Sequence, residues 1–151
     1  MSRPCARITA GHEFLTAILA VKQFLTFVNG APFQPAIAVG LALPDEYFTS
    51  TANALREKRD LLSTGLETAG FDVTRPAGSY FVIADAAPLG FTDAAAFCRQ
   101  LPELAGVVGV PVSAFVRDDR RVEYSSLVRF AYCKRHSVLE DAASRLATLA
   151  R

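Results

Sequence analysis

The first third of the chain carries apolar residues at the three- and four-residue spacing of a helix. Phe14, Ile18, Val21 and Leu25 recur in this way within "EFLTAILAVKQFLTFV", and this period predicts an amphipathic helix. The stretch "NGAPFQPA", residues 29–36, is rich in residues that interrupt regular structure, so it predicts a turn. The uniformly apolar "AIAVGLAL" that follows predicts a short helix.

A longer helical pattern comes next, in "DEYFTSTANALREKRDLLSTGLETAG". Its apolar positions share one stripe with charged residues opposite, which predicts a single long amphipathic helix. Glycine readily adopts the left-handed conformation that ends many helices, so we expect Gly70 to cap this one. The stripe consists of Leu55, Leu62, Leu66 and Ala69.

The period changes from 3.6 to 2 after this helix. "FDVT" and "SYFVIADA", separated by the turn "RPAG", predict two strands, while "GVVGV", residues 106–110, and "LVRFAYC" predict a third and a fourth. The element order is therefore three helices, two strands, a helix, two strands and a helix. Such segregation of helices from strands is typical of α+β domains.

Two helices in the second half have recognisable end signals. "TDAAAFCRQL" is predicted as a helix with Thr92 as its N-cap, and it is expected to end near Pro102 because proline interrupts helices. The last helix has Ser137 and Glu140 at the spacing of a capping box. We therefore expect Ser137 to accept a hydrogen bond from the backbone N–H of Glu140.

The size of the chain suits one domain, since domains commonly contain about 100–200 residues. Of its 151 residues, 51% are hydrophobic and 21% are charged, which is a globular composition with a somewhat high apolar share. No firm boundary divides the chain. Residues 1–44 are expected to form an N-terminal helical segment, and residues 45–151 the part that contains the sheet.

Charge and cysteine content exclude several classes of function. The formal net charge is +1, and the densest basic stretch, "RDDRR", contains two aspartates, so nucleic-acid binding is not predicted. No apolar run is long enough to span a membrane. The three cysteines are Cys5, Cys98 and Cys133; their odd number and their spacing favour reduced thiols in a cytoplasm over disulfides or a zinc site.

Local motifs do not form a complete active site. Phosphate-binding loops of the GxxxxGK and GxGxxG types are missing, as are HExxH and a nucleophile elbow. The two histidines, His12 and His136, are isolated and are expected at the surface. The most informative residue is Arg129, which lies in the middle of the predicted strand "LVRFAYC".

Strand alternation places Arg129 on one face with Leu127, Ala131 and Cys133. A guanidinium keeps its proton at ordinary pH, so among apolar neighbours it requires an anion or water. One interpretation is an edge strand on which Arg129 meets solvent or an internal carboxylate. The other is a half-buried guanidinium that binds the carboxylate or phosphate of a ligand through two parallel hydrogen bonds.

Four blocks of the sequence, spread over residues 11–150, resemble the C-terminal part of class I/II aminotransferases, the fold-type I pyridoxal-phosphate enzymes. The blocks are "VKQFLTFVNGAPFQPAIA", "KRDLLSTGLETAGFDVTRPAGSYFVIAD", "GVVGVPVSAF" and "LVRFAYCKRHSVLEDAASRL". They are most similar to the branch with N-succinyldiaminopimelate, kynurenine, glutamine and methionine aminotransferases. The resemblance implies the small domain of that fold, with N-terminal helices, then a small, mostly antiparallel sheet and helices packed on one face. Residues 1–44 would then be a remnant of the interdomain or large-domain region.

The resemblance also implies roles for individual residues. The family's "RF(A/S)(F/Y)C" arginine, here Arg129, binds the substrate α-carboxylate, and the aromatic residue that matches Tyr80 lines the substrate pocket. Phe27 matches a segment that in some relatives reaches the neighbouring subunit's site. Tyr80 and Phe27 are equally compatible with plain core aromatics. Val112 stands where the family's "PGSAF" has glycine, so the loop beside the pocket is expected to differ.

A departure from the family concerns the lysine that carries pyridoxal 5'-phosphate. None of the lysines, Lys22, Lys58 and Lys134, lies where the family places that amine, so the chain alone is expected to bind the cofactor poorly and to be inactive. The implied enzyme moves an amino group between an amino acid and a 2-oxo acid. The resemblance implies N-succinyl-LL-diaminopimelate as its donor, and it implies either a homodimer or a missing large domain as partner. The alternative is a stand-alone, non-catalytic α+β module for a ligand or protein partner.

Overall fold

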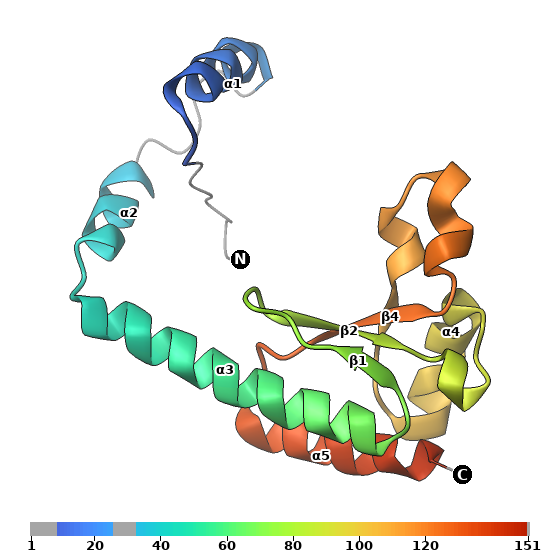
Figure 1. Ribbon diagram of the computed structural model, residues 1–151. Coiled ribbons are helices and arrows are strands. Elements are labelled where there is room, and N and C mark those ends of the chain that lie inside the picture. Colours follow the sequence, from blue (N-terminus) through green and yellow to red (C-terminus); the bar gives the residue numbers. More distant parts are fainter. Residues whose placement is uncertain (1–8, 26–32, 151) are drawn as a thin grey trace. The chain divides into compact units, whose positions relative to one another are not determined.

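The computed structural model describes residues 9–25 and 33–150, and it divides the chain into two compact units, Met1–Phe48 and Thr49–Arg151. Figure 1 shows the elements in chain order. The boundary predicted at residue 44 remains a prediction. The helices and strands are α1 (His12–Leu25), α2 (Phe33–Leu41), α3 (Asp45–Thr68), β1 (Asp72–Thr74), β2 (Phe81–Asp85), α4 (Ala94–Ala105), β3 (Val110–Pro111), β4 (Leu127–Ala131) and α5 (His136–Leu146). Short 3-10 helices are η1 (Ala87–Leu89), η2 (Val112–Phe115), η3 (Asp118–Tyr124) and η4 (Ala147–Leu149).

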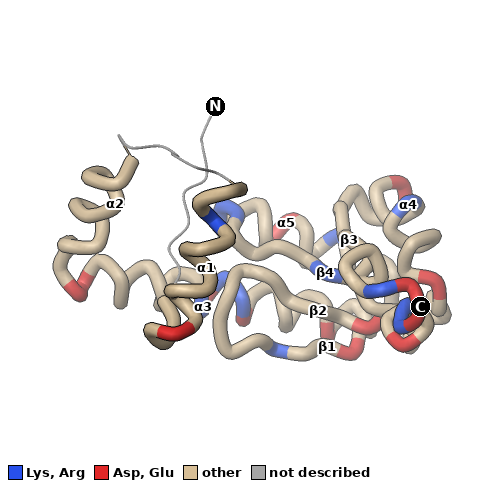
Figure 2. Tube along the Cα trace, turned by 90° about the horizontal axis from the view of Figure 1, so that it is seen from above, with Lys and Arg blue, Asp and Glu red and all other residues tan. Residues whose placement is uncertain are grey.

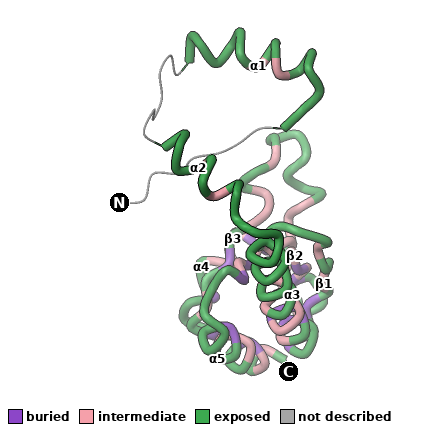
Figure 3. Tube along the Cα trace, turned by 90° about the vertical axis from the view of Figure 1, so that its left-hand side faces the viewer, coloured by how far each residue is buried: buried purple, intermediate pink, exposed green. Residues whose placement is uncertain are grey.

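The first unit contains α1 and α2, and neither helix has a buried residue. Figure 3 shows both helices almost wholly exposed. The predicted helix in this region is confirmed over the described residues, whereas α2 begins at Phe33, inside the stretch predicted as a turn. Pro35 is compatible with this start because a proline in the first helical turn loses no hydrogen bond.

The long helix α3 and its glycine cap agree with the prediction. Leu62 and Leu66 are buried, as the apolar stripe requires. Gly70 has φ 97°, and its N–H donates to the carbonyl of Glu67 while the N–H of Phe71 donates to that of Leu66. This paired arrangement is a Schellman motif, which glycine permits because it lacks a Cβ.

The four strands form one sheet in the order β1-β2-β4-β3, with every pairing antiparallel. β1, β2 and β4 were predicted, but β3 is shorter and later than the predicted strand at 106–110. Gly106, with φ 64°, caps the C-terminus of the preceding helix α4, so this glycine cannot be part of the strand. Val110 pairs with Arg129 and Pro111 with Val128.

The predicted ends of α4 are wrong on both sides. Asp93, not Thr92, is the N-cap, since its carboxylate accepts from the N–H groups of Ala95 and Ala96, and an anion is favourable at the positive end of a helix. The helix also continues through Pro102 to Ala105. Leu101 is buried in the core, and this packing outweighs the local cost of the proline.

The predicted capping box of α5 is also wrong. The helix begins at His136 with Arg135 as an N-cap that makes no side-chain hydrogen bond. Ser137 therefore lies inside the first turn rather than before it. Glu140 instead faces His136, with Oε1 3.3 Å from Nδ1.

The two faces of the sheet differ sharply. Strand residues that alternate toward α3, α4 and α5 are buried, and Figure 1 shows α3 and α5 on one side of the sheet. The opposite face is half-buried and carries Arg129. Helices on one face of a small antiparallel sheet confirm the predicted α+β architecture. The buried strand residues are Val82, Ala84, Val128 and Phe130; their helical partners in the core are Leu62, Leu66, Phe97, Leu101, Leu139 and Leu146.

Charged residues are interspersed along the second unit, as Figure 2 shows. The "RDDRR" stretch and the residues after it form η3 and its entry, with ion pairs Arg121–Asp118 at 3.0 Å and Arg120–Glu123 at 2.6 Å. These arginines are thus largely neutralised locally. Within residues 9–25 and 33–150, no helix combines the length and apolar character that a membrane crossing needs.

Candidate functional site

The candidate site lies on the half-buried face of the sheet, around Arg129 in β4. In the antiparallel register, Arg129 is paired with Ile83 of β2 and with Val110 of β3. Directly paired residues point to the same face, so the arginine has aliphatic neighbours on both sides. Alternation along β4 buries Val128 and Phe130 on the other face.

The guanidinium of Arg129 contacts two aromatic rings. Its Cζ lies 4.1 Å from the ring centroid of Phe81 and 4.2 Å from that of Phe115. Among the described residues, no side chain or carbonyl forms a hydrogen bond or ion pair with this guanidinium. The interpretation of Arg129 as half of an internal ion pair is therefore not supported. Its N–H donors remain suited to a carboxylate, which a guanidinium can bind through two parallel hydrogen bonds.

Phe115 reaches this place through η2, which follows β3 directly. Val112, the residue found where the family has glycine, is the first residue of η2. Across the described chain, Ser79 is the only non-glycine residue with a positive φ, so the backbone at Val112 does not require glycine. We therefore expect valine at this position to add side-chain volume to the loop without requiring a different backbone conformation.

Tyr80 lies at the end of a firmly held loop. This residue is 48% exposed, and its ring centroid is 4.4 Å from that of Phe81. Its carbonyl accepts a hydrogen bond from the N–H of Tyr132, which extends the pairing of β2 with β4. Tyr80 thus stands next to the rings around Arg129, with one side open to solvent.

Tyr132 holds the loop before Tyr80 from the core side. Its hydroxyl donates to the carbonyl of Ser79 at 2.8 Å, and Arg59 of α3 donates to that of Pro76 at 3.1 Å. Ser79 has φ 73°, an unfavourable value for a residue with a Cβ. Burial raises the pKa of the Tyr132 hydroxyl, which keeps this group protonated and able to donate.

Phe81, Phe115 and Tyr132 were not singled out from the sequence. Phe81 and Tyr132 lie in predicted strands, and alternation alone could have placed Phe81 on the same face as Arg129. Phe115 carries no local signal, because the β3–β4 register brings it to the site. Phe27, the third predicted site residue, lies outside the described residues.

The surroundings of Arg129 do not fit pyridoxal phosphate. The two rings over the guanidinium belong to Phe81 and Phe115, which supply neither an amine for the aldehyde nor donors for the phosphate. The described part of the chain also holds no group of three or more metal-ligating side chains. Arg129 and these two rings therefore do not by themselves supply the groups that would hold the cofactor.

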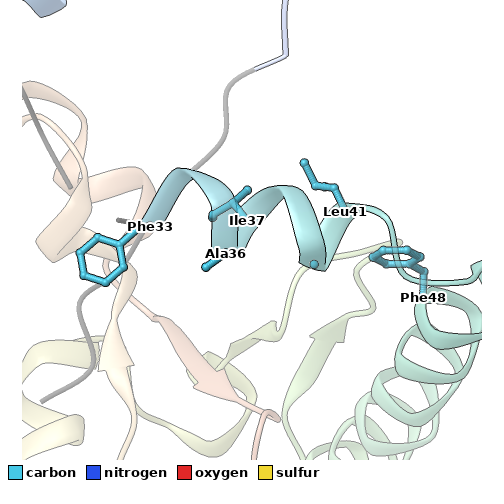
Figure 4. A pocket seen from close by; sticks show the side chains of 6 residues that line it. Phe33, Ala36, Ile37, Leu41 and Phe48 are labelled. Atoms are coloured by element: carbon cyan, nitrogen blue, oxygen red, sulfur yellow. The ribbon is translucent and has the colours of Figure 1, made fainter. Parts of the chain in front are cut away.

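An apolar hollow occurs separately, within the first unit. Figure 4 shows side chains of α2 and Phe48 around it. Its lining contains no charged residue: Phe33, Ala36, Ile37, Gly40, Leu41 and Phe48. Such an open apolar surface is typical of a place where another protein surface packs.

Comparison with known proteins gives a consistent result. Residues 5–146 match the family described as aminotransferase class I and II. The chain is 42% identical over 144 residues to the probable N-succinyldiaminopimelate aminotransferase of Mycobacterium tuberculosis, covering 91% of the chain and 36% of that protein. It is 32% identical to the methionine aminotransferase of Escherichia coli, covering 87% of the chain and 33% of the relative.

Solved structures show the same similarity. The N-succinyldiaminopimelate aminotransferase from Mycobacterium tuberculosis superposes with a TM-score of 0.80 and 43% identity, covering 91% of this chain and 35% of that one. The Escherichia coli protein with methionine aminotransferase function gives a TM-score of 0.75 and 31% identity, covering 88% and 34%. The chain thus spans about a third of the length of the relatives that it matches.

Proposed function

We propose, since the chain belongs to the class I and II aminotransferase family, that it forms the carboxylate-binding part of a pyridoxal-phosphate-dependent aminotransferase. Arg129 would bind the carboxylate of the amino-acid substrate. The observation that carries this proposal is a half-buried guanidinium, without an acidic partner among the described residues, that lies against two aromatic rings. Tyr80 would line the approach to it, and Phe27, which lies outside the described residues, is a further candidate.

The chemistry of amino-group transfer would depend on residues beyond this site. Pyridoxal phosphate, when bound by an aminotransferase, supplies the electron sink and carries the amino group. The residues around Arg129 do not fit that cofactor, so we assign them substrate binding and orientation only. We expect the chain alone to be inactive, and we expect the cofactor to be held by other parts of a protein as long as the relatives.

The proposed substrate pair is an amino acid and a 2-oxo acid. N-succinyl-LL-diaminopimelate is the proposed donor, because the relative at 42% identity is named for that substrate. The whole enzyme would act in the cytoplasm, in keeping with the free thiols of Cys98 and Cys133. The apolar hollow of the first unit would be covered either in a homodimer or by a large domain.

The carboxylate role is tested by titrating the ¹⁵N-labelled chain with 2-oxoglutarate and following arginine Nε–Hε signals. We expect a saturable shift of the Arg129 signal, and none with the dimethyl ester. Arg129→Lys should weaken binding at least about tenfold, because hydrogen bonds to charged groups contribute roughly 1.5–3 kcal/mol. A lysine cannot form the two parallel hydrogen bonds that a guanidinium makes to a carboxylate. Arg99, which is exposed on α4, provides the matched control variant Arg99→Lys, which should bind normally.

A stand-alone binding module is the second candidate. The second unit has its own core, with residues such as Leu66, Val82 and Phe97 essentially buried. Incubation of the chain with pyridoxal phosphate and borohydride distinguishes the candidates from an active enzyme. A reducible lysine adduct with an aldimine absorption band would contradict both candidates, the inactive part of an aminotransferase and the non-catalytic binding module.

A further inference from the structure

The aromatic contacts of Arg129 form a continuous set on the half-buried face. Tyr80 packs on Phe81, and Phe81 and Phe115 each contact the guanidinium. The three aromatic residues come from β2, its entry loop and η2. The set therefore depends on the β2–β4 and β3–β4 registers rather than on one segment.

Ring contacts of this kind have two physical effects on an arginine. The negative potential of a ring face attracts the cation, and contacts within about 6 Å of the centroid are effective. A long side chain also loses its freedom to rotate when its flat end rests on rings, so less entropy remains to be lost on binding. Both effects leave the edge of the guanidinium, with its N–H groups, free for a carboxylate.

We propose that Phe81 and Phe115 are positioning residues that hold the Arg129 guanidinium ready for a carboxylate. This inference rests on the proposed function, and it deepens that function by naming the groups that set the arginine's orientation. Neither residue needs to touch the ligand. Tyr80 packs on Phe81, with ring centroids 4.4 Å apart, which gives Tyr80 a role in addition to lining the approach.

Phe115 is the better residue for a test. This residue is 62% exposed, and it lies on η2 outside the buried core, so its replacement should leave the fold intact. Phe81 lies within β2, where substitution also disturbs strand pairing. Val122 of η3, 84% exposed, provides a control in a neighbouring segment that does not contact Arg129.

The experiment measures the 2-oxoglutarate affinity and the Arg129 Nε–Hε signal of the full chain carrying Phe115→Leu, Phe115→Tyr or Val122→Ala. In Phe115→Leu we expect the ring-induced shift of that signal to decrease and affinity to fall about three- to tenfold, the range expected for a partly desolvated cation–ring contact. The unfolding midpoint should not change. Phe115→Tyr and Val122→Ala should bind like the original chain.

The possible results distinguish a failure of the positioning role from a failure of the carboxylate site itself. Unchanged affinity in Phe115→Leu, in a chain that does bind 2-oxoglutarate through Arg129, would overturn the positioning role alone. Absence of any saturable shift in the unsubstituted chain would overturn the carboxylate site and the positioning role together. If Phe115→Leu lowers the unfolding midpoint, Phe115→Met repeats the test with a side chain of closer size and no ring.

Discussion

Gly65 is expected to control how closely α3 approaches α5, behind the sheet that carries Arg129. A Cβ built at Gly65 would lie 2.5 Å from Cβ and 3.1 Å from Cα of Ala143 on α5. Both distances are shorter than an ordinary contact, and the second involves backbone. Substitution of Gly65 by alanine should therefore push the two helices apart.

Two opposing terms set the size of this effect. Alanine is favoured over glycine within a helix by about 1 kcal/mol, whereas overpacking a well-packed core costs typically about 1–3 kcal/mol. Because the clash includes the Ala143 backbone, we expect the packing cost in the upper part of its range, about 2–3 kcal/mol, and a net fall in the free energy of unfolding of about 1–2 kcal/mol. For a unit of this size, that lowers the thermal midpoint by roughly 4–16 °C.

Thermal unfolding followed by circular dichroism measures the change. Gly40→Ala is the matched control, because a Cβ at Gly40 meets no atom within 4 Å and should be neutral or stabilising. Adding Ala143→Gly to Gly65→Ala should recover part of the loss, as a double-mutant cycle would reveal. A higher midpoint for Gly65→Ala than for the original chain would refute the close contact.

Three further predictions concern the loop, a thiol and an ion pair. Tyr132→Phe should lower the free energy of unfolding by about 1–3 kcal/mol, measured by urea unfolding, because a loop carbonyl loses its buried donor. Burial raises the pKa of Cys98 to about 11, so at pH 8 iodoacetamide should label exposed Cys133 far faster than Cys98, as peptide mass spectrometry can show; equal rates would contradict this. The hydrogen bond from Arg75 lowers the pKa of Glu67 below its ordinary value of 4.5. This pair therefore stabilises the fold above pH 4.5, and its contribution is lost as the pH falls through the lowered pKa. The difference in thermal unfolding midpoint between the original chain and Arg75→Gln should shrink accordingly on acidification.

Elements whose signals come from their own residues were predictable from the sequence. The period and the terminal glycine of α3 appear within one segment, and Gly70 adopts the expected left-handed conformation. The end signals of α4 and α5 were misread because neighbouring residues compete for the same role. Asp93 caps α4 in place of Thr92, and the early start of α5 at His136 takes Ser137 out of the cap position.

The candidate site was predictable only in part, for a related reason. Strand alternation alone singles out Arg129 and the face on which it lies. Its contact with Phe115, by contrast, follows from the pairing of Val110 with Arg129, and β3 is only two residues long. A register carried by so short a strand has almost no sequence signature, so this half of the site could not be inferred.

The absence of an acidic partner for Arg129 within the described chain has a consequence for how the site works. An internal carboxylate would satisfy the guanidinium during folding, but it would also compete with any ligand carboxylate for the same N–H groups. Aromatic rings attract the cation without occupying those donors, so Phe81 and Phe115 can hold the side chain while its hydrogen-bonding edge stays available. A lysine would be a weaker choice here, because a compact ammonium neither stacks flat on two rings nor presents a planar fork. The combination of arginine, two rings and aliphatic register partners therefore supports the proposed binding of an external carboxylate.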